Sequence, residues 1–297
     1  MGADENITDK QLKKEVGGGK LCTLGEWIDL LNMFKSKHRR CETNCYIPLP
    51  VLEEYIKEGR LSYKIISDNT LWLLERERDY YLGYYYVSKG EELNIEPQNL
   101  DMVIYLIGSE KRYADIREEE LVKHSCIKYR RNLEYMFTSD KHPELEKMDG
   151  KCQRFIKKMG LHYTVFHAED YESVYQLWSE RIDKYSVKDM LKSRIRQMET
   201  KEECITVRDS EGNIAASCVF EVNGAVGFSE NIATAASYNG SGVGGALLCK
   251  SFLDILSRGC TKDCMWVWEG NWESRRITER FAQLTGRFSQ QLLLKKA

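Results

Sequence analysis

The chain has 297 residues, of which 42% are hydrophobic and 30% charged, and its charges nearly cancel to a formal net charge of −2. This length suffices for one large domain or two ordinary ones. No basic excess points to nucleic acid as a partner, and no apolar run approaches the roughly 20 residues that a membrane-spanning helix needs.

Ten cysteines without regular spacing predict free thiols in a protein of the reducing cytoplasm. The first residues, MGADENITDKQLKK, lack the pattern of a signal peptide. His38, Cys41 and Cys45 lie close together in the sequence, but three ligands without a fourth candidate make a poor zinc site. We therefore expect no metal.

The first part of the chain reads as two helices followed by strands. Residues 1–20 are polar, contain three successive glycines and predict a mobile lead-in. Helical spacing predicts a helix over Leu24–Phe34, with Thr23 as its cap, and a second helix after Pro50 that ends at Gly59. Strands are then expected between turn residues: Ser62–Ile66, Leu71–Arg76, Tyr80–Val87 and Met102–Ile107.

The middle of the chain predicts a helix over Tyr113–Val122 and a strand over Ile127–Phe137. Pro143 opens a helical segment, and helical spacing resumes over Gln153–Met159. All four prolines lie at or before Pro143, and this shift in composition indicates a domain boundary. We expect a lead-in and two domains, over residues 1–20, 21–150 and 151–297.

The second half predicts a strand, two helices, three strands, a helix, a strand, a helix and a last strand. Turn residues join the second, third and fourth strands. The expected elements are Leu161–Ala168, Asp170–Tyr185, Val187–Met198, Cys204–Arg208, Ile214–Val222, Val226–Thr234, Leu248–Leu256, Met265–Trp268, Trp272–Thr285 (ending at Gly286) and Phe288–Leu294.

Four glycines, at 240, 242, 244 and 245, stand between the strand that ends at Thr234 and the next helix. Glycines here let backbone N–H groups turn toward one point, and the helix N-terminus adds about half a positive charge. The pattern predicts an anion site suited to a pyrophosphate. The alternative is a glycine-rich helix start that holds nothing.

Two phosphate-binding motifs fit these glycines poorly. A P-loop needs Lys and then Ser or Thr after its last glycine, where this chain has Ala246 and Leu247. The spacing approaches the dinucleotide pattern GxGxxG, and Asp263 follows about twenty residues later. However, only 52 residues follow Gly245, too few for the rest of a Rossmann sheet, which disfavours an NAD-dependent oxidoreductase.

The stretch SYNGSGVGGALL resembles the acetyl-CoA pyrophosphate loop of the GNAT superfamily of N-acyltransferases, whose core pattern is Arg/Gln-x-x-Gly-x-Gly/Ala. Here the pattern falls on Asn239, Gly242 and Gly244, with Asn in place of a longer side chain. The element order from residue 160 onward is also similar to the GNAT order. Asn271 before a helix, and a Leu-Gly-Phe-like turn formed by Leu284, Gly286 and Phe288, extend the match.

The resemblance implies an α+β architecture (a mixed α/β sheet) with two GNAT-like domains, each a mostly antiparallel mixed sheet flanked by helices. The first half would be a degenerate copy, because no glycine-rich loop follows Ile107. The alternative for this half is an unrelated α+β domain.

The resemblance further implies transfer of an acetyl group from acetyl-CoA to a primary amine of a small molecule or amino acid derivative, in a ternary complex. The pantetheine arm would lie along Ile232, Ala233 and Thr234. The remaining cofactor-binding residues would be Asn239, Gly240, Ser241, Gly242, Val243, Gly244, Gly245, Asn271 and Ser274.

Acyl transfer needs a base, because an amine with a pKa near 10 must lose a proton before it attacks a thioester. Glu230 is the carboxylate closest to the expected thioester and is the candidate base. The alternatives are that Glu230 is a solvated or paired strand residue, or that Glu221 on the preceding strand is the base. Cys218 and Cys249 have no His partner and read as core thiols.

The family's tyrosine, which can return a proton to the CoA thiolate, is missing. Phe281 or Ala282 stands in its place, and neither has a hydroxyl group. With Asn239, this departure favours the alternative function of a non-catalytic CoA-binding or scaffolding GNAT-like protein.

Overall fold

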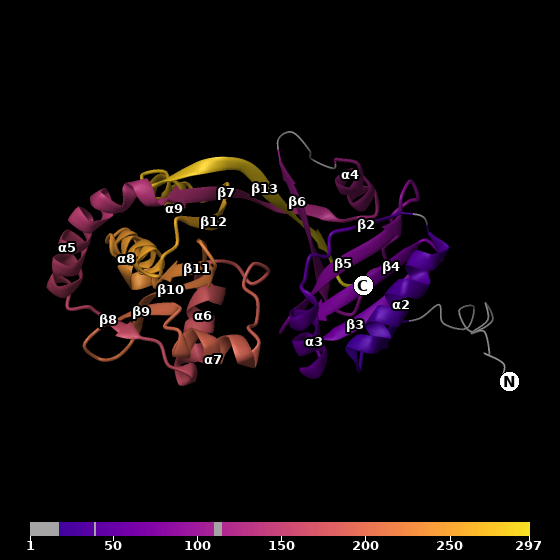
Figure 1. Ribbon diagram of the computed structural model, residues 1–297, viewed down its shortest axis with the longest axis horizontal. Helices are drawn as coiled ribbons and strands as arrows, with labels where there is room; N and C mark the ends of the chain where they lie inside the picture. Colours follow the sequence, from indigo (N-terminus) through magenta and orange to yellow (C-terminus); the bar gives the residue numbers. More distant parts are fainter. Residues whose placement is uncertain (1–17, 39, 110–114) are drawn as a thin grey trace. The chain divides into compact units, whose positions relative to one another are not determined.

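The structure is a computed structural model that describes residues 18–38, 40–109 and 115–297. Its chain divides into two compact units (Figure 1): unit 1 comprises Met1–Arg130 and Ser289–Ala297, and unit 2 comprises Arg131–Phe288. The chain passes from one unit to the other within β7 (Ile127–Thr138) and again within β13 (Ala282–Leu294). This division differs from the linear one expected at residue 150, since residues 131–150 lie in unit 2 and the C-terminal segment returns to unit 1.

Unit 1 confirms the helices and strands expected in the first part of the chain, with small shifts at their ends. Thr23 caps the first helix in a capping box with Glu26. The strand order is β1-β3-β4-β5-β6-β13, and β2 pairs with β5. The elements are β1 (Gly18–Lys20), α2 (Leu24–Lys37), β2 (Cys41–Thr43), α3 (Leu49–Lys57), β3 (Leu61–Ser67), β4 (Thr70–Arg76), β5 (Tyr80–Ser88), β6 (Asp101–Ser109) and α4 (Asp115–Lys123).

The end of the expected lead-in is a strand. Residues 1–17 lie outside the described part of the chain, but Gly18–Lys20 form β1, which pairs with β3 antiparallel. A Cβ atom on Gly18 would lie 2.5 Å from the Tyr63 carbonyl oxygen, and one on Gly19 would lie 2.9 Å from the Tyr63 ring. The glycines therefore permit a close backbone approach, which composition alone does not distinguish from a flexible linker.

The C-terminal segment belongs to unit 1 because it completes that unit's core. Leu292 and Leu294 in β13 are 0% and 3% exposed and pack in one cluster with Trp72 and Ile104. Full burial of a Leu side chain stabilises a fold by about 1.5–3 kcal/mol. Leaving this segment in unit 2 would forfeit that burial.

In unit 1, β5 and β6 pair in parallel, and their register ends at Leu82 and Val103. Farther along the same edge of β5, β2 pairs with residues 86–88. Between the two ladders the Asn44 amide donates to the carbonyls of Gly83 (3.1 Å) and Tyr105 (3.2 Å) and accepts from the Tyr85 N–H (2.7 Å). The opening between β5 and β6 is thus filled by the chain itself. The connection over residues 89–100 forms no helix.

Unit 2 has the element order expected for the second half of the chain. Its strand order is β13-β7-β12-β11-β10-β9-β8. The elements not yet given are α5 (His142–Lys158), β8 (His162–Val165), α6 (Tyr171–Arg181), α7 (Lys192–Thr200), β9 (Cys204–Arg208), β10 (Ile214–Asn223), β11 (Val226–Thr234), α8 (Val243–Ser257), β12 (Lys262–Trp268) and α9 (Trp272–Thr278), with short 3-10 turns at 139–141, 168–170 and 236–238.

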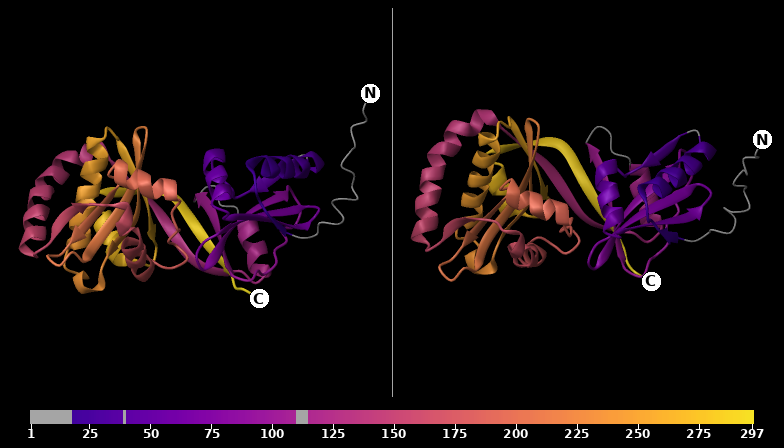
Figure 2. Two further views of the ribbon diagram at one scale, coloured as in Figure 1. Left: turned by 90° about the horizontal axis from the view of Figure 1, so that it is seen from below. Right: turned by 60° about the horizontal axis from the view of Figure 1, so that its bottom comes forward.

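Helices cover both faces of the unit 2 sheet (Figure 1). On one face, Val174 and Trp178 of α6 pack with Val219 and Ala233 of the sheet. On the other face α8 is the central helix, and its apolar side chains join two core clusters with β10, β12 and β7. Helix α5 runs alongside α8, and both views of Figure 2 show this pair. Among the described residues, no helix is both long and apolar enough to cross a membrane.

Three expectations for unit 2 need correction. The helix expected over Trp272–Thr285 ends at Thr278, and the Leu-Gly-Phe-like turn is part of strand β13, which starts at Ala282. Pairing with the sheet outweighs helical spacing here, because Thr285 and Arg287 donate to the Glu134 carboxylate of β7.

The other corrections concern helix ends. Helix α6 ends at Arg181 and α7 starts only at Lys192. The two helical segments after Pro143 are one continuous helix, α5.

Candidate functional site

Strands β11 and β12 of unit 2 diverge at the centre of the sheet. They pair in parallel from Val226 with Lys262 to Ser229 with Met265, and the ladder stops there. Beyond it, the β12-facing edge of residues 230–234 has no strand partner among the described residues. Backbone groups along this edge are therefore free to bind an extended ligand, in the way that an added strand would.

A β-bulge marks the point of divergence. Ser217 of β10 pairs with Ala233, and Val219 pairs with Glu230, so β11 contains one residue more than β10 over this stretch. Within it Asn231 has φ +44°, which is unusual for a residue with a side chain. Because a bulge bends its strand and increases its twist, it turns residues 231–234 away from β12. No sequence signal marked this bulge.

The glycine cluster forms the turn into α8. Gly240 and Gly242 have φ +67° and +98°, and Gly242 is the N-cap of α8. No side chain caps this helix among the described residues, apart from a Ser241 hydroxyl that accepts from the Val243 N–H at 3.3 Å. The first-turn N–H groups of Gly244 and Gly245 have no hydrogen-bond partner within the described structure. They are available to an anion, and the helix dipole favours one there.

Gly244 inside α8 allows close packing around this turn, whereas a Cβ atom on Gly245 would make only ordinary contact. A Cβ atom on Gly244 would lie 3.0 Å from the Thr234 hydroxyl oxygen at the end of β11. A Cβ atom on Gly245 would lie 4.0 Å from the Ile277 side chain of α9. The start of α8 therefore lies directly against the end of the diverging strand, so the open strand edge and the first-turn amides of α8 adjoin as one candidate site.

The side chain of Asn239 forms a hydrogen bond with an arginine from another element. Its side-chain oxygen accepts a hydrogen bond from Nη2 of Arg181 at 2.8 Å, and Nε of the same Arg181 donates to the Thr234 carbonyl at 3.0 Å. Arg181 is the last residue of α6 and comes 58 residues earlier in the chain. A cationic side chain therefore lies at the loop although the loop sequence has none. Sequence analysis missed this residue.

The open edge carries the residues expected along a pantetheine arm. Ile232 packs toward the α8 side of the sheet, and Ala233 packs into the core under α6. Thr234 ends the strand beside Gly244. The structure thus brings Ile232, Ala233 and Thr234 together with the glycine turn. The thiols of Cys218 and Cys249 are fully buried.

Asn271 and Ser274 form a helix cap rather than an open binding group. Asn271 is the N-cap of α9, and its side-chain oxygen accepts from the Ser274 backbone N–H at 3.0 Å. After α9, Phe281 is buried and Ala282 opens β13. Neither of these two positions provides a hydroxyl group.

Glu230 is solvent-exposed and lies on the last β11 position before the bulge. Desolvation by the surrounding protein raises the pKa of its carboxyl group, while Arg194 and Lys188 counteract that rise and Glu221 adds to it. Glu221 is exposed on β10 and lies opposite Phe228, not beside the strand divergence. Of the two carboxylates, Glu230 is the one at the open edge.

Trp266 and Trp268 lie on the same sheet face as Glu230. Met265 and Val267 of β12 pack on the α8 side, so the alternating tryptophans face the other way, and each is 42% exposed. Glu230 is opposite Val219, which packs on the α6 side. This face thus offers exposed aromatic surface near the carboxylate.

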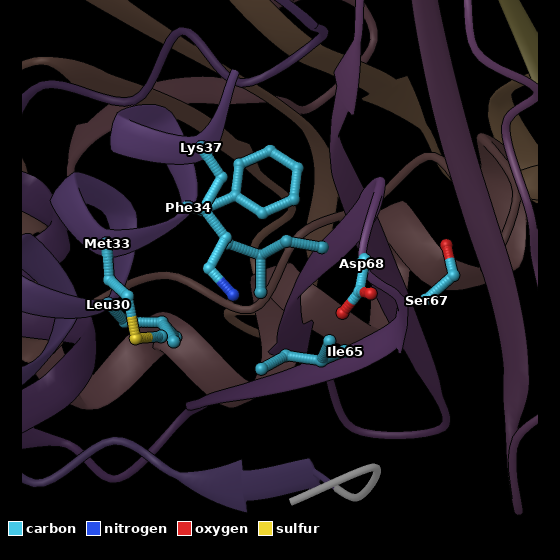
Figure 3. Close-up of a pocket in the computed structure, with 8 residues that line it drawn as sticks. Leu30, Met33, Phe34, Lys37, Ile65, Ser67 and Asp68 are labelled. Carbon is cyan, nitrogen blue, oxygen red and sulfur yellow. The ribbon is translucent and has the colours of Figure 1, made fainter. Parts of the chain in front are cut away.

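Other features of the described chain add no second centre. No group of three or more His, Cys, Asp or Glu side chains in the described residues is placed to hold a metal ion, and all ten cysteines are free thiols. A small pocket in unit 1 lies between α2 and the β3–β4 hairpin (Figure 3). Leu30, Met33 and Phe34 of α2 form its apolar wall, and it contains none of the residues expected to bind CoA.

Several solved structures are similar to this chain. A GCN5-related N-acetyltransferase from Sphaerobacter thermophilus superposes with a TM-score of 0.51 at 12% identity, over 84% of this chain and 86% of its own. A tandem GNAT protein from the clavulanic acid biosynthesis pathway superposes with a TM-score of 0.53 at 10% identity, over 94% of this chain and 98% of its own. This chain has the GNAT fold.

A third similar structure is a GCN5-related glucosamine N-acetyltransferase region of a fungal multi-domain β-N-acetylglucosaminidase, with a TM-score of 0.51 at 12% identity. The match covers 84% of this chain but only 35% of that longer one. No family model and no curated protein matches the sequence. At such low identity the likeness establishes the fold, and the tandem neighbour supports the two-domain architecture.

Proposed function

We propose that this protein is an acetyl-CoA-dependent N-acetyltransferase whose reaction takes place in unit 2. The observation that carries the proposal is the continuous site formed by the open β11 edge and the uncapped, glycine-lined start of α8. An extended arm ending in a diphosphate fits both parts, since strand-like hydrogen bonds would hold the arm and free amides would hold the anion. The ten thiols suit a reducing compartment, and we place the protein in the cytoplasm.

The residues present can hold acetyl-CoA. Nothing lies within 4 Å of where a Cβ atom on Gly240 would stand, so phosphate oxygens have room next to the backbone there, and Gly240 and Gly242 both have positive φ. Ile232, Ala233 and Thr234 would lie along the pantetheine arm. Ser241 and Val243 would contribute through the turn itself, and Asn271 and Ser274 by fixing α9 against the site.

The proposed reaction is direct transfer in a ternary complex with a small amine or amino acid derivative. Glu230 would take a proton from the ammonium group, either itself or through water, and the free amine would attack the thioester carbonyl. A backbone N–H at the open β11 edge would stabilise the developing oxyanion. Collapse of the tetrahedral intermediate would break the C–S bond and release CoA as a thiolate, which would take up a proton from water. Exposed Trp266 and Trp268 would contact apolar parts of the acceptor.

Isothermal titration of the full chain with acetyl-CoA tests this function. We expect saturable binding that Gly242→Trp abolishes, because a side chain at φ +98° is strained and would meet the Phe155 ring, 3.6 Å from the position of the added Cβ atom. Gly212→Trp, at φ +89° in an open hairpin turn, is the matched control and should bind normally. Unchanged binding of acetyl-CoA by Gly242→Trp would show that the binding site is not at this loop.

The absence of a hydroxyl group at Phe281 and Ala282 favours a second candidate, a CoA-binding or scaffolding protein without turnover. In this case acetyl-CoA would bind but no acceptor amine would be acetylated. Release of free CoA thiol, measured across a panel of small amines, separates the two functions. Turnover with any acceptor excludes the second candidate.

A further inference from the structure

The glycine loop lacks a cation of its own, and a residue from another element lies where one is needed. Asn239 stands at the loop position that carries Arg or Gln in the pattern the sequence resembles. Arg181, at the C-terminal end of α6, reaches the loop with its guanidinium group. Because α6 packs on β10 and β11, its last turn is held at the end of β11.

Two hydrogen bonds hold the guanidinium group of Arg181, one to the residue that ends β11 and one to a residue within the glycine loop. Nε donates to the carbonyl of Thr234, and Nη2 donates to the side-chain oxygen of Asn239. These bonds use two of the five guanidinium N–H donors. The other three have no partner among the described residues, and Arg181 forms no ion pair there. Arg181 is exposed, so this charge is available to a ligand.

We infer that Arg181 is a diphosphate-binding residue of the acetyl-CoA site and that Asn239 is a positioning residue that aims its guanidinium group. The inference rests on the proposed function. The planar fork of arginine suits it to this task, since one edge can be held by protein acceptors while the other binds phosphate oxygens. The short Asn239 side chain is then required, because a longer cation at 239 would occupy the place of Arg181.

The test uses the full chain with two probes, CoA and 3′-dephospho-CoA, which both contain the diphosphate. Arg181→Ala should weaken both by the same factor, roughly tenfold or more, as expected for a lost charge-assisted hydrogen bond. The loss should shrink as ionic strength rises. In steady-state assays KM for acetyl-CoA should increase, while kcat at saturating acetyl-CoA is retained. Arg181→Lys should recover only part of the affinity.

Two comparisons separate binding from structural effects. Arg196 of α7 is exposed and has no polar partner among the described residues, so Arg196→Ala should leave both affinities unchanged. Asn239→Ala should weaken binding in the native background but have little further effect in Arg181→Ala, because both changes remove the same contact. Additive losses would show that Asn239 does not act through Arg181.

The outcomes distinguish this inference from the proposed function. If the native chain binds CoA, Gly242→Trp does not, and Arg181→Ala binds normally, the inference is wrong and the proposed function stands. If Arg181→Ala weakens CoA but not dephospho-CoA, Arg181 contacts the 3′-phosphate and the diphosphate assignment is wrong. If the native chain binds neither probe, both the function and the inference are excluded.

Discussion

Glu230 illustrates how residue-scale chemistry is set by neighbours that lie far away in sequence. Its pKa is raised by desolvation, and that effect is opposed by Arg194 and Lys188, from the segment around α7. A carboxylate with a raised pKa is a stronger base than one in free solution. Glu230 lies at the open β11 edge, where the proposed acceptor amine would reach it.

We predict that Glu230→Gln lowers kcat at neutral pH by about 100-fold or more, in the range typical of a lost general base, with little change in CoA affinity. The native rate should rise with pH as this carboxyl group deprotonates, and that limb should be absent from the variant's pH–rate profile. Glu221→Gln is the control. If both variants keep the native profile, another group accepts the proton.

Asp263 is a second titratable residue, buried behind the site on β12. It is 0% exposed; the Ser229 hydroxyl donates to Oδ2 at 2.8 Å, while Oδ1 has no partner in the described structure. Desolvation raises the pKa of Asp263 to about 7, an effect that the Ser229 hydroxyl partly offsets. The neutral acid is therefore the form that the folded protein favours.

The sign of the pH dependence follows from that shift. The unfolded chain loses this proton near the ordinary aspartate pKa of 3.8, and the folded chain near 7, so folding stability is lost as pH rises between these values. The slope from this group is about 1.4 kcal/mol per pH unit at most. The free energy of unfolding of Asp263→Asn, relative to that of the native chain, should thus increase from pH 5 to pH 8, as measured by urea unfolding. An equal difference at both pH values would contradict the assignment.

At the scale of elements, the two units differ at the opening between two diverging parallel strands. Each contains a short parallel strand pair that then diverges, β5 with β6 and β11 with β12. In unit 1 the opening holds β2 and the Asn44 amide, and residues 89–100 replace a glycine turn and helix. In unit 2 the opening is free and leads to α8. The difference lies in which connecting segment follows the first strand of the pair.

Asn44→Ala should destabilise the protein by about 2–3 kcal/mol, because it removes three hydrogen bonds, two to the carbonyls of Gly83 and Tyr105 and one from the Tyr85 N–H. Affinity for acetyl-CoA should not change, since the proposed site lies in unit 2. Gln98→Ala removes only an exposed local hydrogen bond and should cost less than about 0.5 kcal/mol. Urea unfolding with parallel calorimetry measures both quantities. A small loss for Asn44→Ala would show that this amide does not hold the two strands together.

The cap of α9 gives a second test at this scale. Asn271→Ala should lower stability by about 1 kcal/mol, and Asn271→Asp should retain most of it, since a carboxylate also accepts from the Ser274 N–H. If Asn271 is only a cap, the affinity of Asn271→Asp for acetyl-CoA stays native. A large loss of affinity in a well-folded Asn271→Asp would instead make Asn271 a direct ligand.

At the scale of the whole molecule, we expect the proposed acetyl-CoA site in unit 2 and none in unit 1. Within the described ranges, only unit 2 combines a free strand edge with a helix that starts in glycines and has no side-chain cap at its N-cap residue. Titration of the full chain with acetyl-CoA should therefore give a stoichiometry near one. Binding of two equivalents, or one equivalent that survives Gly242→Trp, would place a site in unit 1.

Local sequence determined most elements of both units. Strands β9, β10 and β11 and helices α2 and α8 were predicted from side-chain periodicity, and the glycine turn from its composition, because these signals are carried by neighbouring residues. The same reasoning was wrong where sheet pairing outweighed helical spacing, as over residues 279–285. It also misread Gly18 and Gly19, whose role depends on contact with Tyr63.

The amino-acid sequence by itself determined the order of elements, the GNAT resemblance and the glycine turn, since each depends on residues close together in the chain. Only the tertiary structure decided which edge is open, where Asn231 bends β11, that Asn44 fills the opening in unit 1, and that Arg181 reaches Asn239. Each of these depends on contacts between residues remote in sequence or on backbone conformation that composition does not specify. The physical reason is that local sequence patterns are compatible with several tertiary arrangements. Packing and hydrogen bonding between distant segments select one of them.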